Sequence, residues 1–276
     1  MNMPTTHAAS RLPAPQEPVG ALLRDWRQRR KLSQLDLAMD AEISTRHLSF
    51  IETGRATPSR AMLLRLTERL DLPLRERNAL LLAGGFAPAF AERPLDTPDM
   101  TAARTAVEAI LKGHEPFPAL AVDRHWTLLA ANAALAPLLE GVSAELLRPP
   151  VNVLRLSLHP DGVAPRIENL PEWRSHLLAR LRQQIDQTKD PVLEDLWQEL
   201  RAYPCPASRT PHGPPGIAVP LRLRLGPNAE VFSFLSTTTV FGTPLDITLS
   251  ELALECFYPA DEATRRALTK PASPAP

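Results

Sequence analysis

Residues 33–55, SQLDLAMDAEISTRHLSFIETGR, contain two short helical patterns on either side of a tight turn. Ser33 is followed by Asp36 three residues later, a spacing typical of a helix that starts at a serine cap. Ser44 can cap a second helix, and Gly54 is placed to end it. Two helices joined by such a turn predict a helix-turn-helix, a motif that places its second helix in the major groove of DNA.

The pattern of the second helix separates a buried side from an exposed one. Leu48 and Ile51 are predicted to face the other helices, so the polar residues around them project outward. Arg46 can form a bidentate contact with guanine, whereas Gln34 and Arg55 are predicted to contact backbone phosphates. The complete set of predicted DNA-binding residues is Gln34, Ser44, Thr45, Arg46, His47, Ser49 and Arg55.

Around this motif, apolar residues recur at helical spacing from residue 19 to residue 83 and predict five short helices. Four prolines in the first 18 residues, and an Ala/Ser/Pro-rich stretch after about residue 269, predict disorder at both ends. The predicted organisation is a disordered arm at 1–18, an all-α helix-turn-helix domain at 19–87, a linker and connecting helix at 88–114, an α+β domain at 115–262 and a disordered tail at 263–276.

The second domain is predicted to combine helices with an antiparallel sheet. Apolar stretches at 120–122 and 126–129 flank a polar turn and predict a hairpin. Leu221, Leu223 and Leu225 alternate with arginines, which is typical of a half-buried strand. Strands that precede and follow a set of helices favour an α+β fold. Further strands are expected at 231–240 and 251–258, and helices at 132–139, 145–156, 172–187 and 192–202.

Charge is distributed unevenly in a chain whose 31 basic and 31 acidic residues cancel. Residues 1–90 contain 13 Lys and Arg against 9 Asp and Glu, a net charge of +4, and the remainder contains 18 against 22, a net charge of −4. A basic first part is consistent with nucleic-acid binding there. No run of about 18 apolar residues predicts a membrane span, no signal peptide is recognisable, and two cysteines are too few for a disulfide framework. We therefore expect a cytoplasmic protein.

The sequence contains no pattern typical of a catalytic or metal site. Its seven histidines form no His-Glu-x-x-His motif and no pair beside a cysteine or second acid. There is no Gly-x-Ser-x-Gly elbow and, with 11 glycines, no phosphate-binding loop. We expect a protein that is not an enzyme and uses no cofactor or metal. Two alternatives remain: an enzyme with an appended DNA-binding domain, and a scaffold whose helical domain docks another protein.

Two parts of the chain resemble known families. The segments LSQLDLA at 32–38 and STRHLSFIETGRATPS at 44–59 resemble the lambda-repressor-like (XRE/Cro type) helix-turn-helix family. A resemblance to the MmyB-like regulators, whose ligand-binding domain has a PAS-like fold, is carried by EPFPALAVDRHW at 115–126, AN at 131–132, LHPDG at 158–162, NLPEW at 169–173 and FGTPLD at 241–246. Together the two resemblances cover most of residues 19–260.

These resemblances imply a transcription regulator that binds double-stranded DNA as a homodimer and senses a small, apolar molecule, with a fatty acid as a candidate. Effector sites are typically apolar cavities with a few polar groups, so we expect the pocket on one face of the predicted sheet. Polar side chains near the NLPEW segment can supply the polar groups. The predicted ligand-binding residues are Trp126, Leu128, Arg166, Asn169, Trp173, Leu223 and Phe234.

Overall fold

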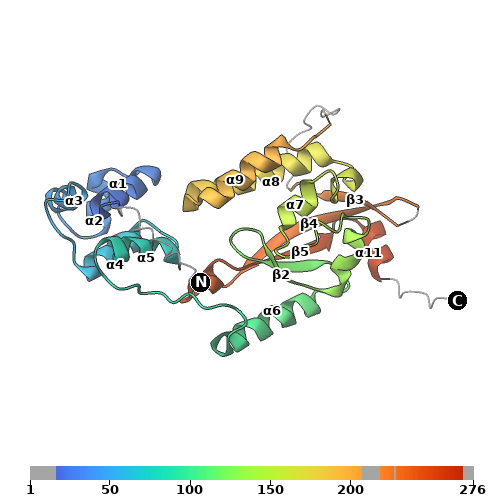
Figure 1. Ribbon diagram of the computed structural model, residues 1–276, viewed down its shortest axis with the longest axis horizontal. Helices are drawn as coiled ribbons and strands as arrows, with labels where there is room; N and C mark the ends of the chain where they lie inside the picture. Colours follow the sequence, from blue (N-terminus) through green and yellow to red (C-terminus); the bar gives the residue numbers. More distant parts are fainter. Residues whose placement is uncertain (1–16, 207–217, 227, 270–276) are drawn as a thin grey trace, which may run out of the picture. The chain divides into compact units, whose positions relative to one another are not determined.

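The computed structural model describes residues 17–206, 218–226 and 228–269. The chain divides into a first unit, residues 1–90, and a second unit, residues 91–276, and Figure 1 labels most of their helices and strands. Nearly all of the predicted N-terminal arm and the end of the predicted tail lie outside the described residues. Within the described ranges, none of the helices is both long and apolar enough to pass through a lipid bilayer.

The described part of the first unit forms the five short helices that the sequence predicts. They are α1 (Val19–Arg29), α2 (Gln34–Asp40), α3 (Thr45–Glu52), α4 (Arg60–Arg69) and α5 (Leu74–Ala83). Their apolar sides meet in one core, where Leu23, Trp26, Leu37, Leu48 and Ile51 are almost fully buried. Each large apolar side chain removed from water contributes about 1.5–3 kcal/mol, so this core holds α2 and α3 in the helix-turn-helix arrangement.

Serine caps fix where three of these helices begin. The Ser33 hydroxyl accepts a hydrogen bond from the Asp36 N–H, and the Asp36 carboxylate accepts one from the Ser33 N–H, which completes a capping box. Ser44 and Ser59 accept in the same way from the third residue of α3 and of α4. A cap of this kind contributes about 1 kcal/mol. Because it depends on residues only three positions apart, the sequence predicts it.

The second unit is an α+β domain built on a five-stranded antiparallel sheet, as the sequence predicts. The strands are β1 (Ala119–Val122), β2 (Leu128–Ala131), β3 (Leu221–Leu225), β4 (Glu230–Val240) and β5 (Ala253–Pro259). They lie in the order β2-β1-β5-β4-β3, with antiparallel pairing throughout. The helices are α6 (Thr101–Gly113), α7 (Val153–Leu158), α8 (Leu170–Thr188), α9 (Pro191–Ala202), α10 (Ile247–Ser250) and α11 (Glu262–Thr269), with 3-10 turns η1 (Pro98–Met100), η2 (Ala133–Leu139) and η3 (Ala164–Arg166).

The sheet separates two apolar cores. On one face, Leu120, Leu223 and Phe234 pack with the buried sides of α7, α8 and α9. On the other face, α6 contributes Val107 and Leu111 to a smaller core with β1 and β5. Figure 1 shows α8 and α9 on one side of the sheet and α6 on the other. The sequence predicts a linker and connecting helix at 88–114, whereas the packing of α6 against β1 and β5 makes this helix part of the second unit.

The predicted disordered tail at 263–276 begins with a helix instead. The Asp261 carboxylate accepts a hydrogen bond from the Thr264 N–H, which caps α11. Thr264 is only 2% exposed, and its hydroxyl accepts from the Ser233 N–H in β4. A hydrogen bond made by a buried hydroxyl is costly to break, and this contact ties α11 to the sheet. The Ala/Ser/Pro-rich composition of the last residues predicts disorder. Composition does not show that Thr264 pairs with Ser233, which lies 31 positions earlier in the chain.

The helix predicted at 145–156 is shorter in the structure. It is α7, which begins at Val153, because Pro149 and Pro150 disfavour helical backbone in the residues before them. The Asn152 side-chain oxygen accepts from the Leu154 N–H and starts the helix.

The helix predicted from Asn132 to Leu139 is the 3-10 turn η2, and Asn132 does not cap it with its side chain. The Asn132 carboxamide is buried, accepting from the Ala119 N–H and donating to the Leu111 and Phe117 carbonyls. Asn132 therefore joins α6, β1 and η2, a role that its position before an apolar run does not indicate.

Candidate nucleic-acid interface and ligand cavity

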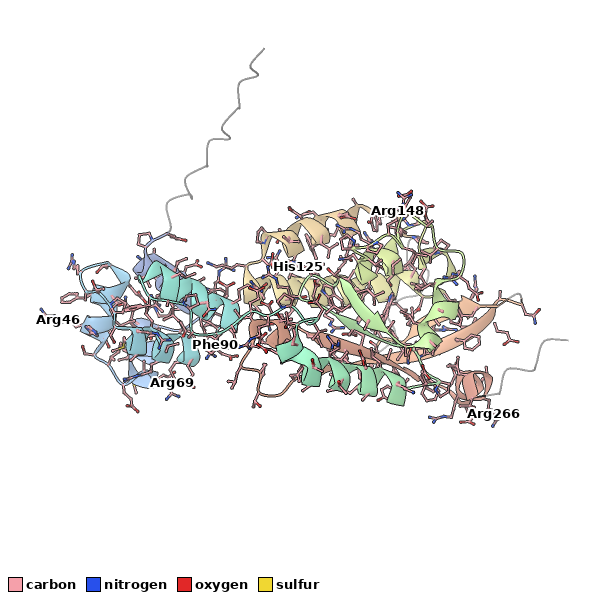
Figure 2. All side chains as sticks on the ribbon, turned by 60° about the horizontal axis from the view of Figure 1, so that its bottom comes forward. Arg46, Arg69, Phe90, His125, Arg148 and Arg266 are labelled. Atoms are coloured by element: carbon pink, nitrogen blue, oxygen red, sulfur yellow. The ribbon has the colours of Figure 1, made fainter. Side chains whose placement is uncertain are left out.

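The N-terminal end of α3 presents polar side chains on the surface of the first unit. Ser44 and Arg46 are exposed, and Thr45, His47 and Ser49 are half-buried. Figure 2 shows Arg46 pointing away from the body of the unit. The structure therefore brings these five predicted residues together on one helix end, and that end suits entry into a DNA groove.

Arg46 is held by an aromatic neighbour rather than by an acid. Its guanidinium carbon lies 5.3 Å from the centre of the Phe50 ring, one turn further along α3. In the described part of the chain, no carboxylate forms an ion pair with Arg46. A cation–π contact orients the guanidinium through the face of its plane and does not use its N–H groups. These N–H groups therefore remain available for a bidentate hydrogen bond.

Ser44 and Arg55 flank α3. The Ser44 hydroxyl accepts from the His47 N–H at 3.1 Å, which leaves its own hydrogen and one lone pair for a further contact. Arg55 is exposed and follows Gly54, whose φ of +74° lets the chain leave the helix in the left-handed region. An exposed arginine in this position suits a phosphate contact.

A buried ion pair joins α3 to α1. Glu52, at the end of α3, is 6% exposed and accepts two hydrogen bonds from Arg27, at 2.6 Å from Nε and 2.9 Å from Nη2. Arg27 also donates from Nη1 to the Leu32 carbonyl at 2.8 Å. The hydrogen bonds to Glu52 raise the pKa of Arg27. Sequence reasoning missed this pair, because 25 positions separate its members and charged residues usually face solvent.

Gln34 and Gly20 belong to the same contact between helices. The Gln34 Nε2 donates to Glu52 Oε2 at 2.8 Å, which leaves one amide hydrogen for the predicted phosphate contact. A Cβ atom added at Gly20 would lie 2.2 Å from the Ile51 carbonyl oxygen, so the backbones of α1 and α3 touch there. The orientation of α3 is therefore set by its C-terminal end, while its N-terminal end stays exposed.

A cavity of about 100 Å³ lies in the larger core of the second unit, between the sheet and the helices. Its wall is mostly apolar, with side chains from β1, β3, η2, α7 and α8. Four predicted ligand-binding residues line it: Trp126, Leu128, Trp173 and Leu223. A wall of this composition suits a small apolar ligand.

The charged groups at the cavity were not found from the sequence. Arg180 on α8 and Glu255 on β5 both line it, and two hydrogen bonds of 2.6 and 3.0 Å join them. Arg180 also donates to the Thr238 hydroxyl at 2.7 Å, and its guanidinium carbon lies 4.6 Å from the centre of the Trp126 ring. Glu255 is 5% exposed. The polar end of the cavity is therefore an ion pair without net charge.

Arg166 and Asn169, two of the predicted ligand-binding residues, do not line this cavity. Arg166 donates to the Leu138 carbonyl at 2.6 Å and borders a separate surface hollow, and burial lowers its pKa. Asn169 donates to the Pro220 carbonyl and accepts from the Arg222 N–H. Both side chains satisfy backbone groups of neighbouring segments, a need that the sequence does not show.

Phe234 also lies off the cavity wall. Its side chain is fully buried, and its ring meets the ring of Phe257 edge-on at 6.4 Å between centres. Phe257 is the residue of this pair that lines the cavity. Phe234 therefore acts as packing behind the wall.

The described residues show no grouping of three or more His, Cys, Asp or Glu side chains that could hold a metal ion.

Cys256 is buried in β5, and burial raises the pKa of its thiol. Nucleophilic catalysis by a cysteine requires a lowered pKa instead. Burial also lowers the pKa of His176, with a further contribution from the positive charge of Arg180. This shift favours the uncharged form of the imidazole.

Comparison with known families agrees with this division of the chain. A helix-turn-helix domain family matches residues 18–80, and the MmyB-like transcription regulator ligand binding domain matches residues 103–270. No curated protein sequence matches the chain. The second family match covers more than half of the chain and includes α11. The chain therefore belongs to the transcription regulators that carry an MmyB-like ligand binding domain behind an N-terminal helix-turn-helix.

Proposed function

We propose that this protein is a sequence-specific regulator of the XRE/Cro type, which reads its operator through α3 and acts in the cytoplasm. The observation that carries the proposal is the first turn of α3, where Thr45, Arg46 and His47 project from a helix whose apolar side is packed in the core. A helix presented in this way fits the major groove. The guanidinium of Arg46 can donate two hydrogen bonds to the O6 and N7 atoms of a guanine. Gln34 and Arg55 are the proposed phosphate contacts.

The operator is read by two copies of the chain. Dimeric helix-turn-helix proteins contact half-sites one helical turn, about 34 Å, apart, so a small change in the spacing of two recognition helices weakens binding. A ligand that prefers one arrangement of the paired second units shifts the population toward that arrangement. In this mechanism, ligand binding alone changes DNA affinity, and the protein does not need to catalyse a reaction.

The second unit is the proposed sensor, with a PAS-like fold. An antiparallel sheet whose one face carries α7, α8 and α9 over an apolar cavity supports this assignment. The effector is small and largely apolar, because leucine and tryptophan side chains form most of the wall. The family resemblance implies a fatty acid as a candidate, and the size and charge of the cavity favour a smaller, uncharged molecule instead.

The salt dependence of DNA binding tests the proposal. We expect the full chain to bind an operator selected from random duplexes, with an affinity that falls steeply as salt rises. A protein that makes about six phosphate contacts loses about 1,000-fold in affinity between 50 and 200 mM salt, because releasing the condensed counterions gains less entropy when the surrounding salt is more concentrated. A mobility-shift titration measures this slope. A chain whose helical domain docks a protein instead shows no duplex binding at low salt, and that result contradicts the proposal.

A further inference from the structure

We propose that the cavity of the second unit takes an uncharged molecule about the size of one ring, with a single hydrogen-bonding group. The inference deepens the proposed sensory function and rests on it. It is carried by the volume of the cavity, by the charge balance between Arg180 and Glu255, and by two hydroxyl groups on the wall.

The volume limits the size of the ligand. The cavity measures about 100 Å³, which is less than the apolar protein cavity of about 150 Å³ that is known to admit benzene, so even a one-ring ligand requires the wall to adjust. Leu223 is fully buried and Trp173 is 4% exposed. Neighbouring side chains therefore pack around both residues and limit their movement. We expect movement of half-buried Leu128 and Val153 to make room for a ring of six to nine heavy atoms, whereas a long acyl chain also requires the packed side chains to separate.

The ion pair between Arg180 and Glu255 disfavours a carboxylate head group, and with it the fatty acid that the family resemblance implies. A carboxylate that leaves the pair intact adds a second negative charge beside buried Glu255, with no cation to compensate it. A carboxylate that displaces Glu255 from Arg180 leaves Glu255 buried, and among the described side chains its remaining hydrogen-bond partner is the Thr238 hydroxyl. Removing one partner of a buried ion pair is costly in either case. An uncharged ligand avoids both costs.

The hydroxyl groups supply the polar contact. Ser157 accepts from the Trp173 Nε1–H at 3.0 Å, and its own hydrogen has no acceptor among the described residues. Ser236 also lines the cavity, and no partner for its hydroxyl is present in the described chain. A carbonyl, hydroxyl or amide on the ligand satisfies one of them without bringing a charge.

Three one-ring probes of nearly equal shape test the charge: benzamide is neutral, benzoate is negative and benzamidine is positive. We expect calorimetric titration of the full chain at pH 7 to show saturable binding of benzamide, with benzoate and benzamidine each weaker by about tenfold or more. Decanoate, a long-chain probe, should bind no better than benzoate. Wild-type protein that prefers benzoate or decanoate, or that binds none of the four probes up to their solubility limits, overturns the proposal.

Two matched variants reverse the preference. Glu255→Gln leaves the positive charge of Arg180 uncompensated, so we expect benzoate to become the best of the three ring probes. Arg180→Gln leaves Glu255 uncompensated, so benzamidine should gain instead. Circular dichroism confirms that each variant is folded, and Thr238→Ala serves as a neutral replacement within the same cluster. If the folded variants keep the wild-type order of the three probes, the charge argument is wrong.

Failure of the sensory function can be distinguished from failure of this ligand class. Benzamide that binds but leaves the DNA mobility shift unchanged contradicts the regulatory role and supports the ligand class. If the chain binds DNA in a salt-dependent way but binds none of the probes, the DNA-binding function is supported. The proposal of an uncharged one-ring ligand is then contradicted.

Discussion

Replacing Glu52 with alanine is expected to destabilise the first unit by about 3–5 kcal/mol, since it leaves the Arg27 guanidinium buried without its partner. Arg27 is 8% exposed, so most of its side chain lies out of contact with water. A loss of this size is a large part of the stability of a small domain. Hydrogen exchange measured by mass spectrometry on the full chain should show faster exchange throughout residues 19–83, with residues 119–259 unaffected.

Two controls separate the buried pair from charge in general. Asp25→Asn removes an acid whose ion pair with Arg29 is exposed, and should change stability by less than about 1 kcal/mol. The double variant Arg27→Met with Glu52→Leu replaces both charges by apolar groups and should recover most of the stability lost by Glu52→Ala. If residues 19–83 of Glu52→Ala exchange their amide hydrogens as slowly as in the wild type, the pair of Arg27 and Glu52 does not stabilise the first unit as proposed.

Phe234→Ala is expected to cost the second unit about 3–5 kcal/mol, because it opens a cavity in a fully buried core. The ring lies between the sheet and the helices and supports Phe257, whose ring lines the ligand cavity. Thermal unfolding of the full chain, with exchange of residues 119–259 as a local readout, measures the loss. Benzamide affinity should fall as well, since the cavity wall loses its support.

Leu235→Ala is the matched control for this prediction. Leu235 is the next residue of β4, points to the opposite face of the sheet and is 37% exposed. Its truncation should cost clearly less than that of Phe234. Equal losses for the two variants indicate that Phe234 does not carry the packing that the structure assigns to it.

The first unit could be predicted from sequence because its signals are local. Ser33, Ser44 and Ser59 cap helices through residues three positions away, and Leu48 and Ile51 recur at helical spacing. The alternating leucines of β3 are a local signal of the same kind. Such patterns give element type and the buried side, which is why the fold class follows from them.

The interactions that position the two sites are not local. Arg27 pairs with Glu52 over 25 positions and Arg180 with Glu255 over 75, and no spacing rule connects residues so far apart. Arg166, by contrast, resembles a ligand-binding residue in sequence but satisfies a backbone carbonyl. Whether a polar side chain faces a ligand or a neighbouring backbone depends on which segments the fold brings together.

The central claim is that Arg46 reads bases, and the ratio of operator to non-operator affinity tests it most directly. Figure 2 shows Arg46 and Arg69 at separate places on the surface of the first unit, so Arg69→Ala removes the same charge away from the proposed interface. In mobility shifts at fixed salt, Arg46→Ala should lose about 1–3 kcal/mol on the operator and much less on a scrambled duplex. Arg55→Ala should weaken both duplexes alike, and Arg69→Ala should change neither. If Arg46→Ala binds the operator as tightly as the wild type does, the proposed recognition surface is wrong.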